Sequence, residues 1–187
     1  IGLHPIAAIS LEKQSTVGQK IRQAIQGKNA TVGVAFSIAG QLFTFNDEHR
    51  YPLMSVFKLH VAIAALQKME NECIALDSLR FIESSQIHKD TYSPLRELYP
   101  ERNFYLSYAD LMRYAVSQSD NNACDILIDY LGGIDIVKDR IDKLGITNYN
   151  LTETEETMHS RISFLFKIWR TPCSTLQLLE KLYNEPI

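Results

Sequence analysis

Ser55-Val-Phe-Lys58 opens an apolar run and predicts a helix over residues 55–69. The run is apolar nearly all round, a pattern typical of a helix at the centre of a domain. A serine and a lysine three positions apart lie on one face of a helix, one turn from each other. Lys58 is the only charged residue between positions 53 and 67, so we expect its amine to be partly dehydrated. Such an amine is neutral part of the time and can accept a hydroxyl proton.

A second polar cluster, Ser119-Asp-Asn121, begins 64 residues after Ser55, between two predicted helices. Each pattern alone has an ordinary structural explanation, as a capping serine with a solvent-reaching lysine or as a turn. Together they supply two hydroxyls, an amine and an amide, the groups of a serine acyl-transfer site. The third element of such sites, Lys-Thr-Gly or Lys-Ser-Gly on a strand, occurs nowhere in these 187 residues.

Composition excludes several classes of function. A length of 187 residues suits one domain with a substantial core, and a net charge of −3 gives no reason to expect nucleic acid or an anionic membrane as partner. No run of about 20 apolar residues is present, and residues 1–10 lack the basic start of a signal peptide. The histidines have no metal-ligand spacing. The scattered cysteines, Cys73, Cys124 and Cys173, are interpreted as small buried hydrophobic residues.

The remaining pattern is mostly helical after an early β-hairpin. A first helix ends near Gly27, and the hairpin comprises 31–38 and 41–45. The first strand of the hairpin is apolar on both faces, which is typical of a covered strand in the middle of a sheet. No second strand group is recognised downstream. Residues 146–170 lack periodicity, which favours a functional loop. Further helices are predicted over 108–117, 121–131, 134–144 and from Thr171-Pro172 onward.

A single strand pair is a marginal sheet, and its unpaired edge invites pairing with other chains. We therefore expect the natural protein to continue past residue 187 and to supply further strands. The alternative is a complete chain whose hairpin lies flat on the helices.

Taken together, these motifs resemble the class A serine β-lactamases, within the penicillin-recognising serine hydrolases. The resemblance implies an α/β (α+β) β-lactamase/transpeptidase-like fold: a mostly helical block plus an N-terminal β-hairpin, with the C-terminal strands of the sheet absent. It implies one truncated domain over 1–187, divided into 1–53 (helix and hairpin), 54–147 (helical part), 148–170 (omega-type loop) and 171–187 (helix). The matching segments are Leu53-Met-Ser-Val-Phe-Lys-Leu-His60, Tyr92-Ser-Pro-Leu95, Ser119-Asp-Asn-Asn-Ala-Cys-Asp-Ile-Leu127, Glu153-Thr-Glu-Glu-Thr-Met-His159 and Thr171-Pro172.

The resemblance also implies catalytic roles. Ser55 would attack the lactam carbonyl, and Lys58 would help to take its proton, although the base in acylation is disputed. Ser119 would relay a proton to the leaving nitrogen, and Asn121 would hold the substrate amide and Lys58. Glu155 would activate the deacylating water.

Two further residues would line the substrate site, and the loop contains more than one candidate for the catalytic glutamate. Tyr92 matches an aromatic residue at the rim of the family's cleft, and a solvent-exposed loop tyrosine is the alternative. His159 stands where the family usually has asparagine, and with Asp125 it resembles a subgroup of class A. Glu155 is chosen over Glu153 and Glu156 by its register with Met-His, and a solvated acidic stretch is the alternative. No metal or cofactor is implied.

The predicted function is the hydrolysis of β-lactam antibiotics, with this chain an inactive fragment. In the family, the Lys-Thr-Gly strand binds the substrate carboxylate and gives one oxyanion-hole amide, and loss of one such donor costs about 3–4 kcal/mol. The alternatives are a penicillin-binding transpeptidase or carboxypeptidase, and a non-catalytic β-lactam sensor or pseudoenzyme. The resemblance implies a periplasmic or secreted monomer, and a dimer through the open strand edge is the alternative for the truncated form.

Overall fold

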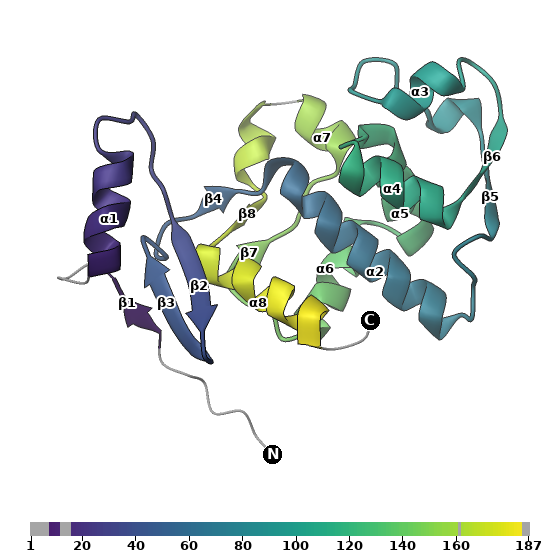
Figure 1. The fold of residues 1–187 in the computed structure, drawn as a ribbon. Coiled ribbons are helices and arrows are strands. Elements are labelled where there is room, and N and C mark those ends of the chain that lie inside the picture. Colours follow the sequence, from purple (N-terminus) through teal and green to yellow (C-terminus); the bar gives the residue numbers. More distant parts are fainter. Residues whose placement is uncertain (1–7, 12–15, 161, 185–187) are drawn as a thin grey trace. The chain divides into compact units, whose positions relative to one another are not determined.

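A computed structural model describes residues 8–11, 16–160 and 162–184 (Figure 1). These residues divide into two compact units. Unit 1 contains the chain up to Tyr51, Thr147–Tyr149 and the segment from Arg170 through the last described helix. Unit 2 contains Pro52–Ile146 and Asn150–Trp169. The expectations for residues 1–7 and for a helix over 185–187 lie outside the described residues.

Unit 1 contains a three-stranded sheet with strand order β1-β3-β2. The predicted hairpin is confirmed, because β2 and β3 pair antiparallel through a two-residue turn at Ala39-Gly40, where both φ angles are positive. β1 pairs in parallel with β3 and was missed, because two residues carry no periodic signal. The elements of unit 1 are β1 (Ile9–Ser10), α1 (Thr16–Ile25), β2 (Val34–Ile38), β3 (Gln41–Phe45) and α8 (Pro172–Asn184).

The predicted neighbour on the outer side of β2 lies outside the described residues, so the prediction of a covered middle strand stays a prediction. Within the described residues β3 is the middle strand and β2 lies at the edge. Its side chains are half-buried or exposed, and Ile38 is 61% exposed. The residues that the structure describes therefore cover the apolar side chains of β2 only in part. The predicted start of the last helix is confirmed, since Thr171 Oγ1 accepts a hydrogen bond from the Ser174 amide at 3.3 Å.

Unit 2 is built around helix α2, which begins at Phe57 rather than Ser55, because Met54–Val56 form a 3-10 turn. α2 packs against three other helices, which confirms its central position. These helices begin and end close to the predicted residues. They are α4 (Tyr108–Ser117), α5 (Asn121–Leu131) and α6 (Ile134–Lys143).

Unit 2 also contains a strand pair that sequence patterning did not predict. β5 (Leu79–Ile82) pairs antiparallel with β6 (Phe104–Ser107). Leu79 and Phe81 are 67% and 44% exposed, whereas the intervening Arg80 is partly buried. This alternation is the reverse of the usual amphipathic strand, so it gives no recognisable signal. The pair is supported across the strands by Phe81 and Tyr105, whose ring centroids lie 5.1 Å apart.

The predicted irregular stretch over 146–170 contains short regular elements, each too brief to show periodicity. The other short elements of the described chain are β4 (Tyr51–Pro52), a 3-10 turn over Ser84–Gln86, α3 (Pro94–Leu98), β7 (Tyr149–Asn150), α7 (Glu155–Ser160), a 3-10 turn over Ile162–Phe166 and β8 (Trp169–Arg170). No helix of the described ranges is long and apolar enough to cross a membrane. Cys124 is buried as predicted, whereas Cys73 is exposed, and all three cysteines are free.

The corner between α4 and α5 is held by a buried carboxylate. Asp120 is fully buried and caps α5, accepting the Ala123 amide at 2.9 Å. The same carboxylate accepts the Ser93 hydroxyl at 3.0 Å and the Leu95 amide at 2.7 Å. Ser119 has a φ of +56°, a left-handed conformation that these contacts hold in place. The corner is therefore a rigid junction between α5 and the start of α3.

We predict that Asp120→Ala destabilises the protein by about 3 kcal/mol or more, because buried donors lose their acceptor at roughly 1–3 kcal/mol each. Urea unfolding followed by circular dichroism measures this change. The matched control is Asp129→Ala on the same helix, where the side chain is exposed and the change should stay within about 0.5 kcal/mol. Equal midpoints for the two variants would contradict the role given to Asp120.

Candidate active site

Ser55 stands on the 3-10 turn directly before α2, where its side chain is exposed. Two features fix its position. Phe57, the first residue of α2, is fully buried, and the backbone of Met54 has a φ of +46°, an uncommon value for a residue with a side chain. The serine hydroxyl is therefore presented to solvent from a constrained segment of backbone.

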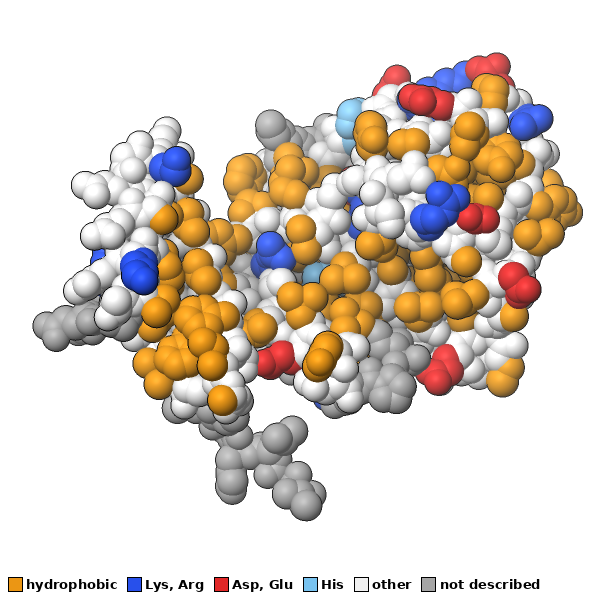
Figure 2. Space-filling model, in the orientation of Figure 1, with side chains coloured by type: hydrophobic (Ala, Val, Ile, Leu, Met, Phe, Trp, Pro, Cys, Tyr) orange, Lys and Arg blue, Asp and Glu red, His pale blue; other side chains and the backbone are white. Residues whose placement is uncertain are grey.

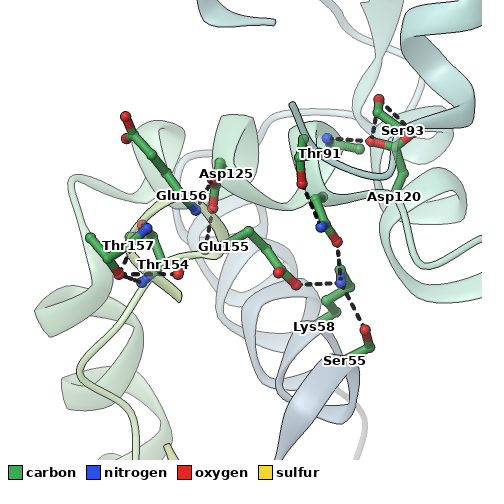
Figure 3. A network of polar contacts seen from close by, with 12 residues as sticks. Ser55, Lys58, Thr91, Ser93, Asp120, Asp125, Thr154, Glu155, Glu156 and Thr157 are labelled. Carbon is green, nitrogen blue, oxygen red and sulfur yellow. Dashed lines mark hydrogen bonds and ion pairs between the residues drawn. The ribbon is translucent and has the colours of Figure 1, made fainter. Parts of the chain in front are cut away.

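Lys58 lies beneath that hydroxyl and is only 1% exposed. Its Nζ donates to Ser55 Oγ at 3.1 Å and to Asn121 Oδ1 at 2.9 Å, and it forms an ion pair with Glu155 Oε1 (Figure 3). An ammonium group has three donors, so these three oxygens satisfy all of them. The contacts join residues of α2, α5 and α7 at one nitrogen atom.

The ion pair is largely hidden from water, with side-chain exposures of 1% for Lys58 and 11% for Glu155. A buried charge without a partner costs several kcal/mol. Of the three neighbouring glutamates of this loop, Glu155 is the one that meets Lys58. Glu153 pairs with Lys167 at 2.9 Å, and the Glu156 side chain is 66% exposed.

The oxygen and the nitrogen of the Asn121 side-chain amide are both hydrogen-bonded. Its Oδ1 accepts from Lys58, while its Nδ2 donates to Thr91 Oγ1 at 2.7 Å, and its backbone amide donates to the Tyr92 carbonyl at 3.0 Å. Asn122 is fully buried and binds both the amide and the carbonyl of His88, at 2.9 and 3.1 Å. Sequence reasoning missed Thr91 and Asn122, because nothing local marks them as partners of a distant segment.

Asp125 on α5 holds the first turn of α7. Its two carboxylate oxygens accept the backbone amides of Glu155 and Glu156, each at 2.9 Å. Burial raises the pKa of Asp125 to about 7, although the two amide hydrogen bonds act in the opposite direction. Figure 3 shows this carboxylate beside the backbone from which the Glu155 side chain extends toward Lys58. The glutamate is therefore positioned from its backbone as well as from its side chain.

A cavity of about 440 Å³ opens over these groups. The predicted site residues, which are spread over 105 positions of the sequence, all line this cavity except Lys58. Lys58 does not line it but is hydrogen-bonded to Ser55, which does. Its lining consists of Met54, Ser55, Tyr92, Ser119, Asn121, Glu155, Met158, His159 and Leu165. A cavity of about 500 Å³ beside α3 contains Lys89 and Glu101, which pair with each other at 2.6 Å. Ser84 also lines it, but the Lys89 amine is paired with Glu101, and no contact between this amine and the Ser84 hydroxyl is seen among the described residues.

The chemistry available in the smaller cavity is nucleophilic. An exposed hydroxyl contacts an amine that is itself paired with a carboxylate, and a second serine lines the same space. Burial raises the pKa of the Cys124 thiol well above its ordinary range, so this nearby cysteine is not a competing nucleophile. Among the described residues, no group of three histidine, cysteine, aspartate or glutamate side chains could hold a metal ion.

Comparison with known proteins identifies β-lactamases as relatives of this chain. The beta-lactamase enzyme family model matches residues 16–187. A β-lactamase from Bacteroides uniformis is 44% identical over 172 residues, covering 91% of this chain and 58% of that protein. Beta-lactamase VEB-1 from Pseudomonas aeruginosa is 30% identical over 167 residues, covering 88% of this chain and 56% of that protein.

Solved structures agree. A class A β-lactamase from Bacteroides cellulosilyticus DSM 14838 superposes with a TM-score of 0.87 at 42% identity, covering 91% of this chain and 61% of that chain. The present chain thus spans about three fifths of the length of these relatives. It belongs to the beta-lactamase enzyme family and has part of the class A β-lactamase fold.

Proposed function

We propose that the protein takes part in β-lactam hydrolysis through an acyl-enzyme on Ser55. The observation that carries this proposal is the set of contacts made by Lys58 Nζ, which joins the serine hydroxyl at 3.1 Å, the Asn121 amide oxygen and the Glu155 carboxylate. A nucleophile hydrogen-bonded to a base that is itself held by a third group is the general signature of an activated hydroxyl.

In acylation, Ser55 Oγ forms a bond to the lactam carbonyl carbon as its proton leaves toward Lys58. Because Lys58 contacts Glu155 directly, the proton it already carries can pass to that carboxylate. The lactam C–N bond then breaks, and the nitrogen receives, through Ser119 in the same cavity, the proton that Lys58 took from Ser55. Glu155 then returns its proton to Lys58. Asn121 and Tyr92 line the side of the cavity along which the substrate amide would lie.

In deacylation, Glu155 takes a proton from a water molecule that attacks the acyl carbonyl, and the Ser55–acyl bond breaks as a proton returns to Ser55 Oγ. Glu155 and His159 line the cavity on the same short helix, α7. This carboxylate also separates the proposal from its nearest alternative, a penicillin-binding transpeptidase or carboxypeptidase that remains acylated. A sensor would likewise keep the adduct, and a pseudoenzyme would form none.

These 187 residues contain no Lys-Thr-Gly or Lys-Ser-Gly segment, the element that in the resembled enzymes binds the substrate carboxylate and completes the oxyanion hole. Loss of one oxyanion donor alone costs about 3–4 kcal/mol. We therefore propose that the chain by itself does not turn over β-lactams, and that the activity belongs to a protein of the length of its relatives. The proposed setting is periplasmic or secreted.

The first test replaces Glu155 by Gln in this chain joined to the unmatched C-terminal part of the Bacteroides uniformis relative. We expect steady-state penicillin hydrolysis to fall by about 10²–10⁴-fold, the range of general-base catalysis. Intact-mass spectrometry should show a stable penicilloyl adduct, which peptide mapping places on Ser55.

The matched control for that variant is Glu156→Gln, whose exposed side chain lies one residue away and whose loss should leave turnover unchanged. Rapid deacylation of Glu155→Gln would point to another base. A lasting adduct on the unsubstituted joined protein would favour the transpeptidase or sensor instead.

Asp125 also makes the stability of the folded protein depend on pH. Its pKa of about 7 lies above the ordinary 3.8 that it has in an unfolded chain. Between these values the unfolded state has released its proton while the folded state retains it, so this group lowers stability as pH rises through that window. Full titration corresponds to at most about 4 kcal/mol. Burial is the main cause, and the nearby Glu155 and Asp129 add to it.

We predict that Asp125→Asn flattens this pH dependence. Relative to the unsubstituted chain, the variant should gain about 2–4 kcal/mol of stability between a pH of about 4.5 and a pH of about 8, measured by urea unfolding. Asp77→Asn, a change at an exposed position, should follow the unsubstituted chain throughout. Parallel curves for Asp125→Asn and the unsubstituted chain would show that the carboxyl titrates normally.

A further inference from the structure

The segment that leads into α3 carries part of the cavity rim but has no regular structure of its own. Residues 87–93 form neither helix nor strand, so no regular ladder of backbone hydrogen bonds satisfies their carbonyls. Tyr92 lines the active-site cavity, and the Thr91 hydroxyl accepts the side-chain amide of Asn121 at 2.7 Å. Other contacts must therefore hold this segment in place.

One nitrogen atom of Arg96 collects three carbonyls of the 87–93 segment. Its Nη1 donates to the carbonyl of His88 at 3.2 Å and to that of Thr91 at 2.9 Å, and it also donates to the Lys89 carbonyl. A guanidinium presents its donors in a fixed planar fork and has no acceptor, so it suits several converging carbonyls. The segment thus folds around the end of this side chain.

The arginine and the segment are both tied to the buried corner between α4 and α5. Ser93 Oγ accepts the Arg96 amide at 3.2 Å and donates to the Asp120 carboxylate at 3.0 Å. From α5, the Asn122 side chain donates to the His88 carbonyl at 3.1 Å, so this carbonyl accepts from both Arg96 and Asn122. The segment is therefore held between α3 and α5.

Arg96 differs from the charged residues around it. Charged side chains of both signs lie on the surface around α3 (Figure 2), where Lys89 and Glu101 pair with side-chain exposures of 73% and 76%. Such exposed pairs contribute little. Arg96 is instead half-buried and binds backbone carbonyls. It lines the cavity beside α3 and not the active-site cavity, so any effect on a substrate passes through other residues.

We propose that Arg96 is a positioning residue for acylation, an inference that rests on the function proposed above. Arg96 fixes the backbone of Thr91, and the Thr91 hydroxyl fixes the side-chain amide of Asn121 (Figure 3). The Lys58 ammonium only donates, so the Asn121 oxygen faces it and the nitrogen faces Thr91. Thr91 occupies one N–H of that nitrogen and leaves the other for a carbonyl oxygen of the substrate.

The proposed effect is confined to one step of the reaction. Without Arg96 the 87–93 segment loosens, and the amide that aligns the substrate for attack loses its support. Glu155 is held separately, by Lys58 and by Asp125. The contact of the segment with α7 joins His88 to the exposed Glu156 side chain at 3.9 Å, where solvent screens it. Acylation should therefore slow while deacylation keeps its rate.

The first measurement separates the two steps in the joined protein described above. With Glu155→Gln present to trap the adduct, rapid-quench mass spectrometry follows the formation of the penicilloyl adduct. We expect Arg96→Met and Thr91→Val each to slow it roughly tenfold, about the worth of one hydrogen bond. Thr91→Ser keeps the hydroxyl and should restore the rate. With Glu155 intact, the decay of the adduct in single turnovers should change by less than about twofold.

The matched control is Arg102→Met. It removes an exposed guanidinium that lies 5.4 Å from the centroid of the Tyr99 ring, and it should leave both rates unchanged. Acylation at full rate in Arg96→Met, or an equal loss in Arg102→Met, would overturn the proposal. A slower decay of the adduct in Arg96→Met would overturn it as well, because the effect would then lie on the other step.

A second measurement needs no catalysis and uses the 187-residue chain. Hydrogen exchange followed by mass spectrometry should show that Arg96→Met raises exchange of a peptide covering 87–93 by about tenfold, while a peptide covering α6 is unchanged. Unchanged exchange over 87–93 would overturn the proposal. If exchange rises but the joined protein forms no adduct, the function proposed above fails, and with it the role in acylation, while the hold of Arg96 on the segment stands.

Discussion

The ammonium group of Lys58 is almost fully removed from solvent, and three oxygen atoms from three different segments keep it there. A buried cation without such partners would cost several kcal/mol, so the pairing with Glu155 constrains where α7 can lie relative to α2. The same nitrogen contacts the serine hydroxyl. A buried charge that needs partners for stability is thus also the group that can activate a nucleophile.

Two aspartates, the fully buried Asp120 and the half-buried Asp125, extend this constraint away from the reacting groups. Asp120 fixes the corner that carries Asn121, through one hydroxyl and two backbone amides. Asp125 fixes the backbone of Glu155. Both act on backbone rather than on the cavity itself, so each can be altered without removing a side chain that lines the cavity. Substitutions at such positions change the geometry of a site while its reacting side chains stay in place.

The sequence was most informative where function and local geometry coincide. Ser55 and Lys58 are one helical turn apart, and the 119–121 corner follows from helix-ending and capping signals, so local patterns in the chain were enough to locate both. What joins them could not be predicted residue by residue, because the contacts of Thr91, Asn122 and Asp125 span 30 or more positions. Strand β5 was missed for a different reason, because its apolar side chains face outward.

The two units satisfy their polar groups in different ways. In unit 2 the buried side chains of Lys58, Asp120 and Asn122 all find partners within the unit. In unit 1, β2 is an edge strand of the described sheet, so alternate backbone amides and carbonyls of β2 have no partner strand there. Backbone polar groups are obligatory hydrogen-bonding groups, whether water or another strand satisfies them. Unit 2 therefore closes its polar network around Lys58 with its own side chains, whereas the outer edge of β2 leaves its backbone groups to water or to a strand beyond the described residues.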